Sequence, residues 1–393
     1  MSFKPAKSPP SFSVLGEKYQ PQSNWTASSS KFKTPAHSVI FAVSKNAQQK
    51  IFVVNTFQGF MVSENYETGG DIAELSTEKM QVTSIDFSPS VEPLVLLTFS
   101  LGHILLIDPI RRARGKVQWF NSQRNLYSSR PPCICRFFNQ EDYIVLFEDN
   151  TMWKFKLSLK TEEERNIIYL ASRIRENRDS IPGFCQLDIP KPESNPVGLW
   201  KFFCGSIRDV RMSPNSNLFA MINSDGQLRV FDFIRNQHLV CFESYFGGLL
   251  SLSWSLDGKL VATGGEDDAV SVWNLEQRKL VYRGEGHSSW VAGVCFGKTN
   301  GDNYILWSAG EDGKLLIWDI NLEDAEASNQ EPRGERRDFI THPCRLELPL
   351  MEPILEVFVS GDPLQDIIVK EDGVFVCDSG GFIIRWVVKN DVI

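Results

Sequence analysis

The feature that most constrains the fold of this chain is a repeated pattern of two short apolar runs separated by an acidic or glycine-containing turn. The pattern is clearest in three consecutive stretches: RMSPNSNLFAMINSDGQLRVFDF from Arg211, WSLDGKLVATGGEDDAVSVWNL ending at Leu275, and YILWSAGEDGKLLIWDI ending at Ile320. Each second run closes on an aromatic residue followed by Asp or Asn, and these aromatics are Phe231, Trp273 and Trp318. They stand 42 and 45 residues apart, which indicates copies of one structural unit.

This period, together with Gly286-His287 and Trp318-Asp319, is typical of a WD-repeat blade. Weaker copies extend the pattern in both directions and close at Val62, Ile107, Phe155 and Trp386. Once an N-terminal segment and two insertions are set aside, about 42 residues remain for each of seven repeats. The sequence therefore predicts an all-β fold, a seven-bladed WD40 β-propeller with two loop insertions.

The predicted organisation is an N-terminal segment, residues 1–37, and a propeller, residues 38–390, with insertions at 158–196 and 321–345. Neither insertion contains a predicted strand, so we expect both to be dispensable for folding. Because a propeller is completed by a terminal strand in its last blade, we expect that strand within residues 11–37. The first insertion predicts a one-sided helix that either lies on the propeller or binds a partner, since apolar residues recur at helical spacing at Ile167, Leu170, Ala171 and Ile174.

Composition narrows the functional classes. The 41 basic and 49 acidic residues give a net charge of -8, which argues against a surface that coats nucleic acid. The short basic run Arg111–Lys116 could meet phosphate groups, but such runs are more often solvated loops. The first residues lack the apolar core of a signal peptide, and no run of about 18 apolar residues could span a membrane. We therefore expect a cytoplasmic or nuclear protein with reduced cysteines.

The sequence contains no arrangement typical of an enzyme, a metal site or a cofactor site. Its five histidines are too dispersed for a metal cluster or a catalytic triad. His287 has the spacing to Ser308, Asp312 and Trp318 that WD repeats use for a buried hydrogen-bond network, so its role is expected to be structural. The preceding blade has Tyr245 in place of the histidine, and Tyr245 is therefore expected to point inward.

The stretch Ser244–Gly248, SYFGG, is predicted to lead into the first strand of one blade, and Gly286–Trp290 into the next. Phe246 and Trp290 would then lie on one rim of neighbouring blades, flanked by glycine and serine residues that cannot cover them. Exposed aromatics of this kind are frequent anchors of protein interfaces; the alternative is that both rings pack between blades. The predicted partner-binding residues are Tyr245, Phe246, Gly247, Gly248 and Trp290.

The run SYFGGLLSLSWSLDGKLVATGGEDDAVSVWNL, followed by GHSSWVAGVCF, resembles the central blades of the creC family, which includes fungal creC and animal WD repeat-containing protein 20. The similarity extends to FSLGHILLIDPI, to NSDGQLRVFDF and to the closing LMEPILEVFVSGDPLQDIIVKEDGVFVCDSGGFIIRWVV. It covers residues 82–320 and 346–388 and is strongest over 244–296. Leu256 departs from the family, which usually has proline there.

The resemblance implies a non-catalytic subunit that binds and activates a ubiquitin-specific protease of the creB type. It also implies that Phe246 and Trp290 touch the protease and that a second WD-repeat protein could join the complex. The chain by itself is expected to be monomeric. The alternative is a general assembly scaffold, such as a ubiquitin-ligase substrate receptor or an RNA-processing subunit. A ligase receptor would usually carry Trp-Asp-x-Arg, which the blade endings lack at Trp318–Asn321, Trp273–Glu276 and Phe231–Ile234.

Overall fold

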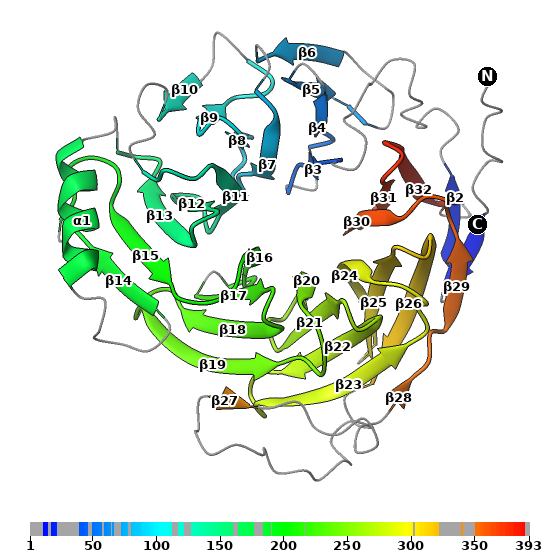
Figure 1. The fold of residues 1–393 in the computed structure, drawn as a ribbon. Coiled ribbons are helices and arrows are strands. Elements are labelled where there is room, and N and C mark those ends of the chain that lie inside the picture. Colours follow the sequence, from blue (N-terminus) through cyan, green and yellow to red (C-terminus); the bar gives the residue numbers. More distant parts are fainter. Residues whose placement is uncertain are drawn as a thin grey trace. The chain divides into compact units, whose positions relative to one another are not determined.

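The computed structural model describes residues 11–14, 17–21, 39–45, 49–56, 59–63, 65–66, 72–77, 80–111, 117–121, 127–159, 164–176, 184–189, 191–215, 217–301, 303–321, 339–340 and 350–389. Over these residues the secondary structure consists of one helix, α1 (Glu164–Glu176), and strands β1 to β32, which form seven sheets (Figure 1). The prediction of a seven-bladed β-propeller is confirmed, with each sheet as one blade. The chain divides into two compact units, residues 40–212 and residues 1–39 with 213–393.

The unit of residues 40–212 contains three of the blades. The first has β3 (Phe41–Val43), β4 (Phe52–Thr56), β5 (Gly59–Ser63) and β6 (Ile72–Ser76). The second has β7 (Val82–Phe87), β8 (Val95–Phe99), β9 (Ile104–Ile107) and β10 (Val117–Phe120). The third has β11 (Pro132–Phe137), β12 (Asp142–Phe147), β13 (Thr151–Lys156), β15 (Gly198–Phe202) and β14 (Phe184–Asp188). Strand β16 (Ile207–Met212) ends this unit.

The other unit contains four blades. The first includes β17 (Leu218–Asn223), β18 (Gln227–Asp232), β19 (Gln237–Glu243) and β27 (Phe339–Ile340). The second has β20 (Leu249–Trp254), β21 (Leu260–Gly265), β22 (Ala269–Asn274), β23 (Lys279–Glu285) and β28 (Leu350–Met351). The third has β24 (Val291–Asn300), β25 (Asn303–Gly310), β26 (Lys314–Ile320) and β29 (Leu355–Phe358). The fourth has β30 (Leu364–Lys370), β31 (Gly373–Asp378), β32 (Ile383–Lys389), β2 (Glu17–Pro21) and β1 (Phe12–Val14).

The residues that close the sequence repeats occupy equivalent positions in the blades. All seven lie in the strand that follows a blade's second turn and are buried: Val62, Ile107, Phe155, Phe231, Trp273, Trp318 and Trp386. Such a strand is paired on both sides, so a large apolar residue there contacts neighbours from two strands at once. In the last blade, β2 pairs antiparallel with β32, which places residues 17–21 where a completing strand was expected. The rest of the segment 22–37 lies outside the described residues.

The insertions do contribute strands, so the expectation that they add none was wrong. In the first insertion, β14 pairs antiparallel with β15. In the second, β27 pairs in parallel with β19. Both strands form hydrogen bonds with backbone groups along the outer edge of a blade. This role needs no strong alternation of apolar and polar residues, so it left no clear signal in the sequence.

The helix expected in the first insertion is present as α1. Ile167 and Leu170 are buried against the core that contains Phe155 and Trp153, whereas Ile168 and Tyr169 are exposed. The apolar face of α1 therefore packs onto its blade, as in the first of the two interpretations of this helix. The side chain of Ile174 lies outside the described residues.

Neighbouring blades are joined at their first strands by side-chain-to-backbone hydrogen bonds. The N–H of Phe296 in β24 donates to Ser253 Oγ in β20 over 3.1 Å. In the other unit the N–H of Phe137 in β11 donates to Asp86 Oδ2 in β7 over 2.7 Å. A Cβ at Gly264, which pairs with Ser251 near the start of β20, would lie 2.6 Å from Cγ1 of Val291, the first residue of β24, so β20 and β24 begin at the same end of their blades. This end carries the loops that the sequence predicts to bind a partner.

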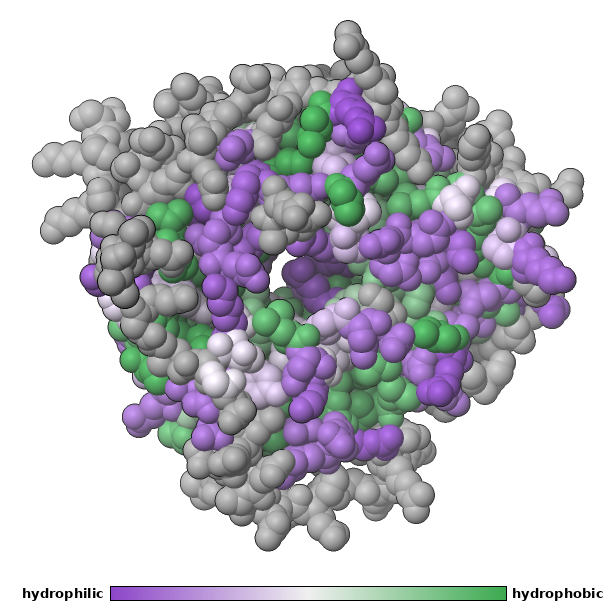
Figure 2. Space-filling model, turned by 180° about the vertical axis from the view of Figure 1, so that it is seen from behind, coloured by the Kyte–Doolittle hydropathy of each residue, from purple (hydrophilic) through white to green (hydrophobic). Residues whose placement is uncertain are grey.

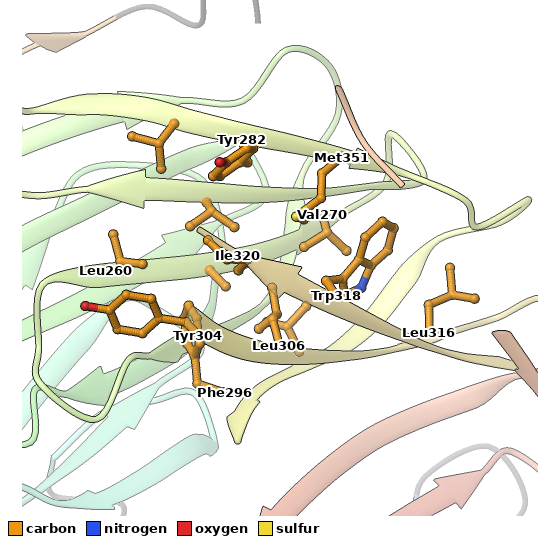
Figure 3. Close-up of a cluster of buried hydrophobic side chains, with 14 of the residues drawn as sticks. Leu260, Val270, Tyr282, Phe296, Tyr304, Leu306, Leu316, Trp318, Ile320 and Met351 are labelled. Atoms are coloured by element: carbon orange, nitrogen blue, oxygen red, sulfur yellow. The ribbon is translucent and has the colours of Figure 1, made fainter. Parts of the chain in front are cut away.

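A hydrophobic core fills the space between these same two blades. Figure 3 shows its side chains gathered into one cluster, which takes Leu260, Val270 and Tyr282 from one blade, Phe296, Tyr304, Leu306, Leu316, Trp318 and Ile320 from the other, and Met351 from β28. Because buried apolar side chains interlock and resist displacement, this core fixes the two blades, and hence their loops, relative to each other.

The visible surface of the described residues is mixed in character. Figure 2 shows hydrophobic residues scattered among hydrophilic ones, so hydropathy alone does not single out a binding surface there. Among the described helical residues, no segment is long and apolar enough to cross a membrane. In the predicted basic run, Arg111 forms an exposed ion pair with Glu92 over 3.6 Å, and residues 112–116 lie outside the described residues.

Candidate protein-interaction surface

The loop of Ser244–Gly248 is fixed to the blade it enters by hydrogen bonds. The N–H of Gly248 donates to Glu266 Oε2 over 2.9 Å, and the N–H of Glu266 donates back to the carbonyl of Gly248 over 2.9 Å. The hydroxyl of Ser244 donates to the carbonyl of Gly247 over 3.0 Å. The loop is thus tied to the turn between β21 and β22, which limits the conformational entropy that binding would remove.

Phe246 projects from this loop into solvent. Its side chain is 70% exposed, the most of any aromatic residue described. Gly247 follows with a φ of 67°, and a Cβ at that position would lie only 2.9 Å from Cβ of Glu266. A residue with a side chain would therefore be strained and would clash, so glycine is what permits the loop to pass beside Glu266 and leave Phe246 uncovered.

Tyr245 does not point inward, and the expectation that it replaces a buried histidine was wrong. Its side chain is 54% exposed. The inner position is filled by Arg283 of β23, whose guanidinium Nη1 lies 3.6 Å from Asp267 Oδ2, with both side chains 6% exposed. The arginine reaches Asp267 from the outer strand of the same blade and makes an inward tyrosine unnecessary.

Trp290 stands at the same end of the next blade and is 44% exposed. Its carbonyl accepts the N–H of Glu311 over 2.8 Å, which fixes the residue to the turn between β25 and β26. Neither Trp290 nor Phe246 belongs to the described buried cores, in contrast to the alternative in which both rings pack between blades.

The residues behind Trp290 form a buried hydrogen-bond network. His287 Nε2 lies 2.8 Å from Ser308 Oγ, and His287 Nδ1 lies 3.1 Å from Asp312 Oδ1. The indole N–H of Trp318 donates to Ser308 Oγ over 2.9 Å. Burial alone would raise the pKa of Asp312, but hydrogen bonds from His287 and from the N–H of Ser288 outweigh it and leave this pKa below its usual value.

This network resembles a serine–histidine–aspartate triad in composition, but its position fits a structural role. Ser308 is fully buried, and its hydroxyl is engaged by Trp318 as well as by His287. A catalytic serine needs an exposed oxygen that a substrate can approach. A Cβ at Gly310 would lie 2.4 Å from His287 Nδ1, so glycine at that position leaves the space that the imidazole occupies.

Sequence reasoning missed one exposed aromatic at this end, Phe358 at the end of β29. It is 60% exposed and lies opposite Lys314, and the N–H of the following Val359 donates to the carbonyl of Gly313 over 2.9 Å. Phe358 and Trp290 therefore flank the same turn, Glu311–Gly313. The alternation in Leu355–Phe358, where Val357 is buried and Phe358 exposed, is the signal that could have revealed it. We call Tyr245, Phe246, Trp290 and Phe358 the rim surface.

Comparison with known proteins agrees with the repeats and the motifs. The family model described as "WD domain, G-beta repeat" matches residues 237–274 and 278–319, which contain most of the two blades that carry the rim surface. The UBP9-binding protein bun62 of Schizosaccharomyces pombe is 28% identical over 334 residues, which cover 74% of this chain and 61% of that protein. The WD repeat-containing protein 20 homolog of Caenorhabditis elegans is 30% identical over 210 residues, covering 51% of this chain and 27% of that protein.

In both comparisons the matched region is less than two thirds of the relative's length. The match to bun62 nevertheless runs through most of this chain, well beyond the two repeats that the family model detects. The chain therefore contains WD repeats, and its resemblance to the family of creC and WD repeat-containing protein 20 is confirmed.

Proposed function

We propose that this chain is a non-catalytic subunit that binds a ubiquitin-specific protease of the creB type through the rim surface and activates it. One observation carries the proposal: Phe246 and Trp290 are exposed at the same end of two adjoining blades, on loops fixed by backbone hydrogen bonds. The relative named as a UBP9-binding protein supports the class of partner.

The geometry of the rim surface suits a stable interface. An aromatic side chain can bury about 150–250 Å², and apolar area contributes about 25 cal/mol per Å². Two exposed rings held in fixed positions could therefore supply several kcal/mol before the costs of association. The loops of Phe246 and Trp290 are already ordered by their bonds to Glu266 and Glu311, so little further ordering would oppose binding.

The proposed mechanism of activation is conformational. The rim surface presents rings rather than a nucleophile, and the Ser308–His287 pair is buried behind it. The chain would therefore raise protease activity by binding the competent conformation of the protease more tightly than the others. Couplings of this kind are typically about 1–3 kcal/mol, a change of roughly 5- to 150-fold.

The test is a pull-down of a creB-type protease with Phe246→Ala and Trp290→Ala, together with thermal melts of the same variants. Each change should weaken binding by about 2 kcal/mol or more, as for aromatic hot spots, while the melting temperature changes little. Lys259→Ala is the control, because Lys259 is exposed on the turn between β20 and β21, at the opposite end of the blade. Variants that stay folded and bind like the wild type would contradict the proposal.

Activation needs its own measurement. Hydrolysis of a fluorogenic ubiquitin substrate by the protease should rise when the wild-type chain is added at saturation and should not rise with Phe246→Ala at the same concentration. If the chain binds the protease and leaves its rate unchanged, the activation part of the proposal fails. The chain would then act as an assembly scaffold.

A further inference from the structure

Acidic side chains border the rim surface on every loop and turn that reaches it. Those that are exposed or half-buried are Asp225, Glu243, Glu266, Asp268, Glu285, Glu311 and Asp362. Hydrogen bonds place several of them beside the rings. The N–H of Ser244, next to Glu243, donates to the carbonyl of Gly226, next to Asp225, over 2.7 Å, and Glu311 is bonded through its own N–H to Trp290.

Three basic side chains at this end are engaged with other groups. Arg283 is buried. Its Nε lies 3.3 Å from Glu285 Oε1, and its Nη1 lies 3.6 Å from Asp267 Oδ2. The ammonium of Lys314 lies 2.8 Å from Glu356 Oε1, and the guanidinium of Arg229 donates to Gln227 Oε1 over 2.7 Å. The acidic side chains named above outnumber these cations, so the net charge around the rim surface is negative.

The opposite end of the same blades has a different character. It carries exposed Arg235, Lys259, Arg278 and Lys298, along with exposed acidic residues such as Glu276. The two ends of this unit therefore differ in charge, and only the end with the exposed rings is predominantly acidic. Opposite charges across an interface disfavour binding of other proteins and raise the association rate. The difference in charge between the two ends therefore constrains the charge of the partner's docking face.

We propose that the partner face that docks on the rim surface has apolar pockets for the rings and is bordered by lysine or arginine side chains. The inference rests on the proposed function, since it describes the protease face that would meet Phe246 and Trp290. Acidic groups around the rings would draw such a face in and repel acidic surfaces. Charges of this kind act mainly on the association rate, which then falls with ionic strength.

The test compares two variants of identical net charge. Glu243→Lys/Glu311→Lys reverses two charges beside the rings, and Glu276→Lys/Glu371→Lys reverses two exposed charges at the opposite end. Association of each with an immobilised creB-type protease is measured by surface plasmon resonance at low and high salt. The first variant should associate about tenfold more slowly than wild type at low salt, and the difference should shrink to about twofold in 0.5 M salt. The second should associate like wild type.

The outcomes separate this inference from the function on which it rests. If wild type binds through Phe246 and Trp290 but both double variants associate alike, or association does not depend on salt, the basic partner face is refuted and the proposed function stands. If wild type does not bind the protease, the proposed function fails and the inference fails with it. Circular dichroism of both variants checks that a slow association does not reflect unfolding.

Discussion

The guanidinium carbon of Arg283 lies 5.1 Å from the centre of the Tyr245 ring. This contact joins a buried ion pair to an exposed aromatic, because Arg283 also faces Asp267 inside the blade. A cation held against an aromatic face is attracted by the ring's quadrupole. The position of Tyr245 on the rim surface therefore depends on a charge pair in the interior of the blade formed by β20 to β23.

Replacing Arg283 with methionine should destabilise the protein by about 3–5 kcal/mol, since the Asp267 carboxylate would remain buried without its partner. Urea unfolding at pH 7 measures the loss. The double variant Asp267→Asn/Arg283→Met removes both charges and should recover most of the stability. A double variant as unstable as the single one would mean that packing of the arginine stem, not charge, is what the site needs.

The loss of stability caused by Arg283→Met should change with pH in a defined direction. Burial raises the pKa of Asp267 above its ordinary value, although Arg283 opposes the shift, and loss of the arginine should raise it further. A carboxyl with a raised pKa in the folded state favours folding when protonated, and this contribution is lost as pH rises. The deficit of Arg283→Met relative to wild type should therefore shrink as pH falls from 7 toward about 4.

The sequence predicted the repeat architecture because its strongest signals lie at buried, doubly paired positions. Trp273 and Trp318 are fully buried in the third strands of their blades, where large residues and a fixed spacing are both required. The fifth strands β27 and β28 were not predictable, since each has two residues and is defined by a distant strand, β19 or β23, rather than by its own pattern.

The rim was predictable in part. The two glycines after Phe246 indicated a ring that nothing could cover, and its exposure matches that expectation. The orientation of Tyr245 was not predictable, because the ion-pair partner of Asp267 is Arg283, which lies 16 positions further along the chain in β23. A repeat alignment compares equivalent positions and cannot reveal that a residue from another strand has taken over a role.

Trp318→Ala should cost about 3–5 kcal/mol, the range for deletion of a large buried aromatic. The indole is fully buried in the cluster of Figure 3, and its N–H would no longer donate to Ser308. Chemical denaturation gives the value. A loss below about 1 kcal/mol would contradict the assignment of Trp318 to a packed core.

Asp312→Asn should cost about 1–2 kcal/mol at pH 7 by weakening the hydrogen bonds that Asp312 accepts from His287 and Ser288. Because the pKa of Asp312 lies below its ordinary value, its contribution is present above about pH 4 and is lost as pH falls through the folded-state pKa. The difference between wild type and variant should therefore narrow in urea unfolding at pH 3. Asp362→Asn, at an exposed position, is the control, and a gap that stays constant with pH would refute the charge-based explanation.

Leu170→Ala and Ile168→Ala test whether helix α1 is part of the fold. Leu170 is fully buried in the core beneath the helix, whereas Ile168 is 62% exposed. The first change should cost about 2–5 kcal/mol and the second less than about 0.5 kcal/mol, measured by urea unfolding. Equal small effects would show that the helix is dispensable, as the sequence first indicated.

The second insertion is expected to behave differently. Its stretch Ala325–Arg336 lies outside the described residues, and two residues separate it from β27. Replacing that stretch with a glycine–serine linker of equal length should leave the thermal midpoint nearly unchanged, since β27 is retained. A large drop would show that the segment contributes to the packing of the fold.

Phe358→Ala should weaken protease binding without unfolding the protein. The ring is 60% exposed, and it flanks the turn Glu311–Gly313 on the side opposite Trp290, so a partner that covers Trp290 would be in reach of it. We expect a loss of about 1–2 kcal/mol in binding free energy, less than at Phe246, because a ring near the edge of an interface remains partly exposed to solvent. Leu256→Ala is the matched control, since Leu256 is 62% exposed on the turn at the opposite end. Both variants are compared with wild type by calorimetric titration against the protease; equal affinities for all three would place Phe358 outside the interface and confine the contact to Phe246 and Trp290.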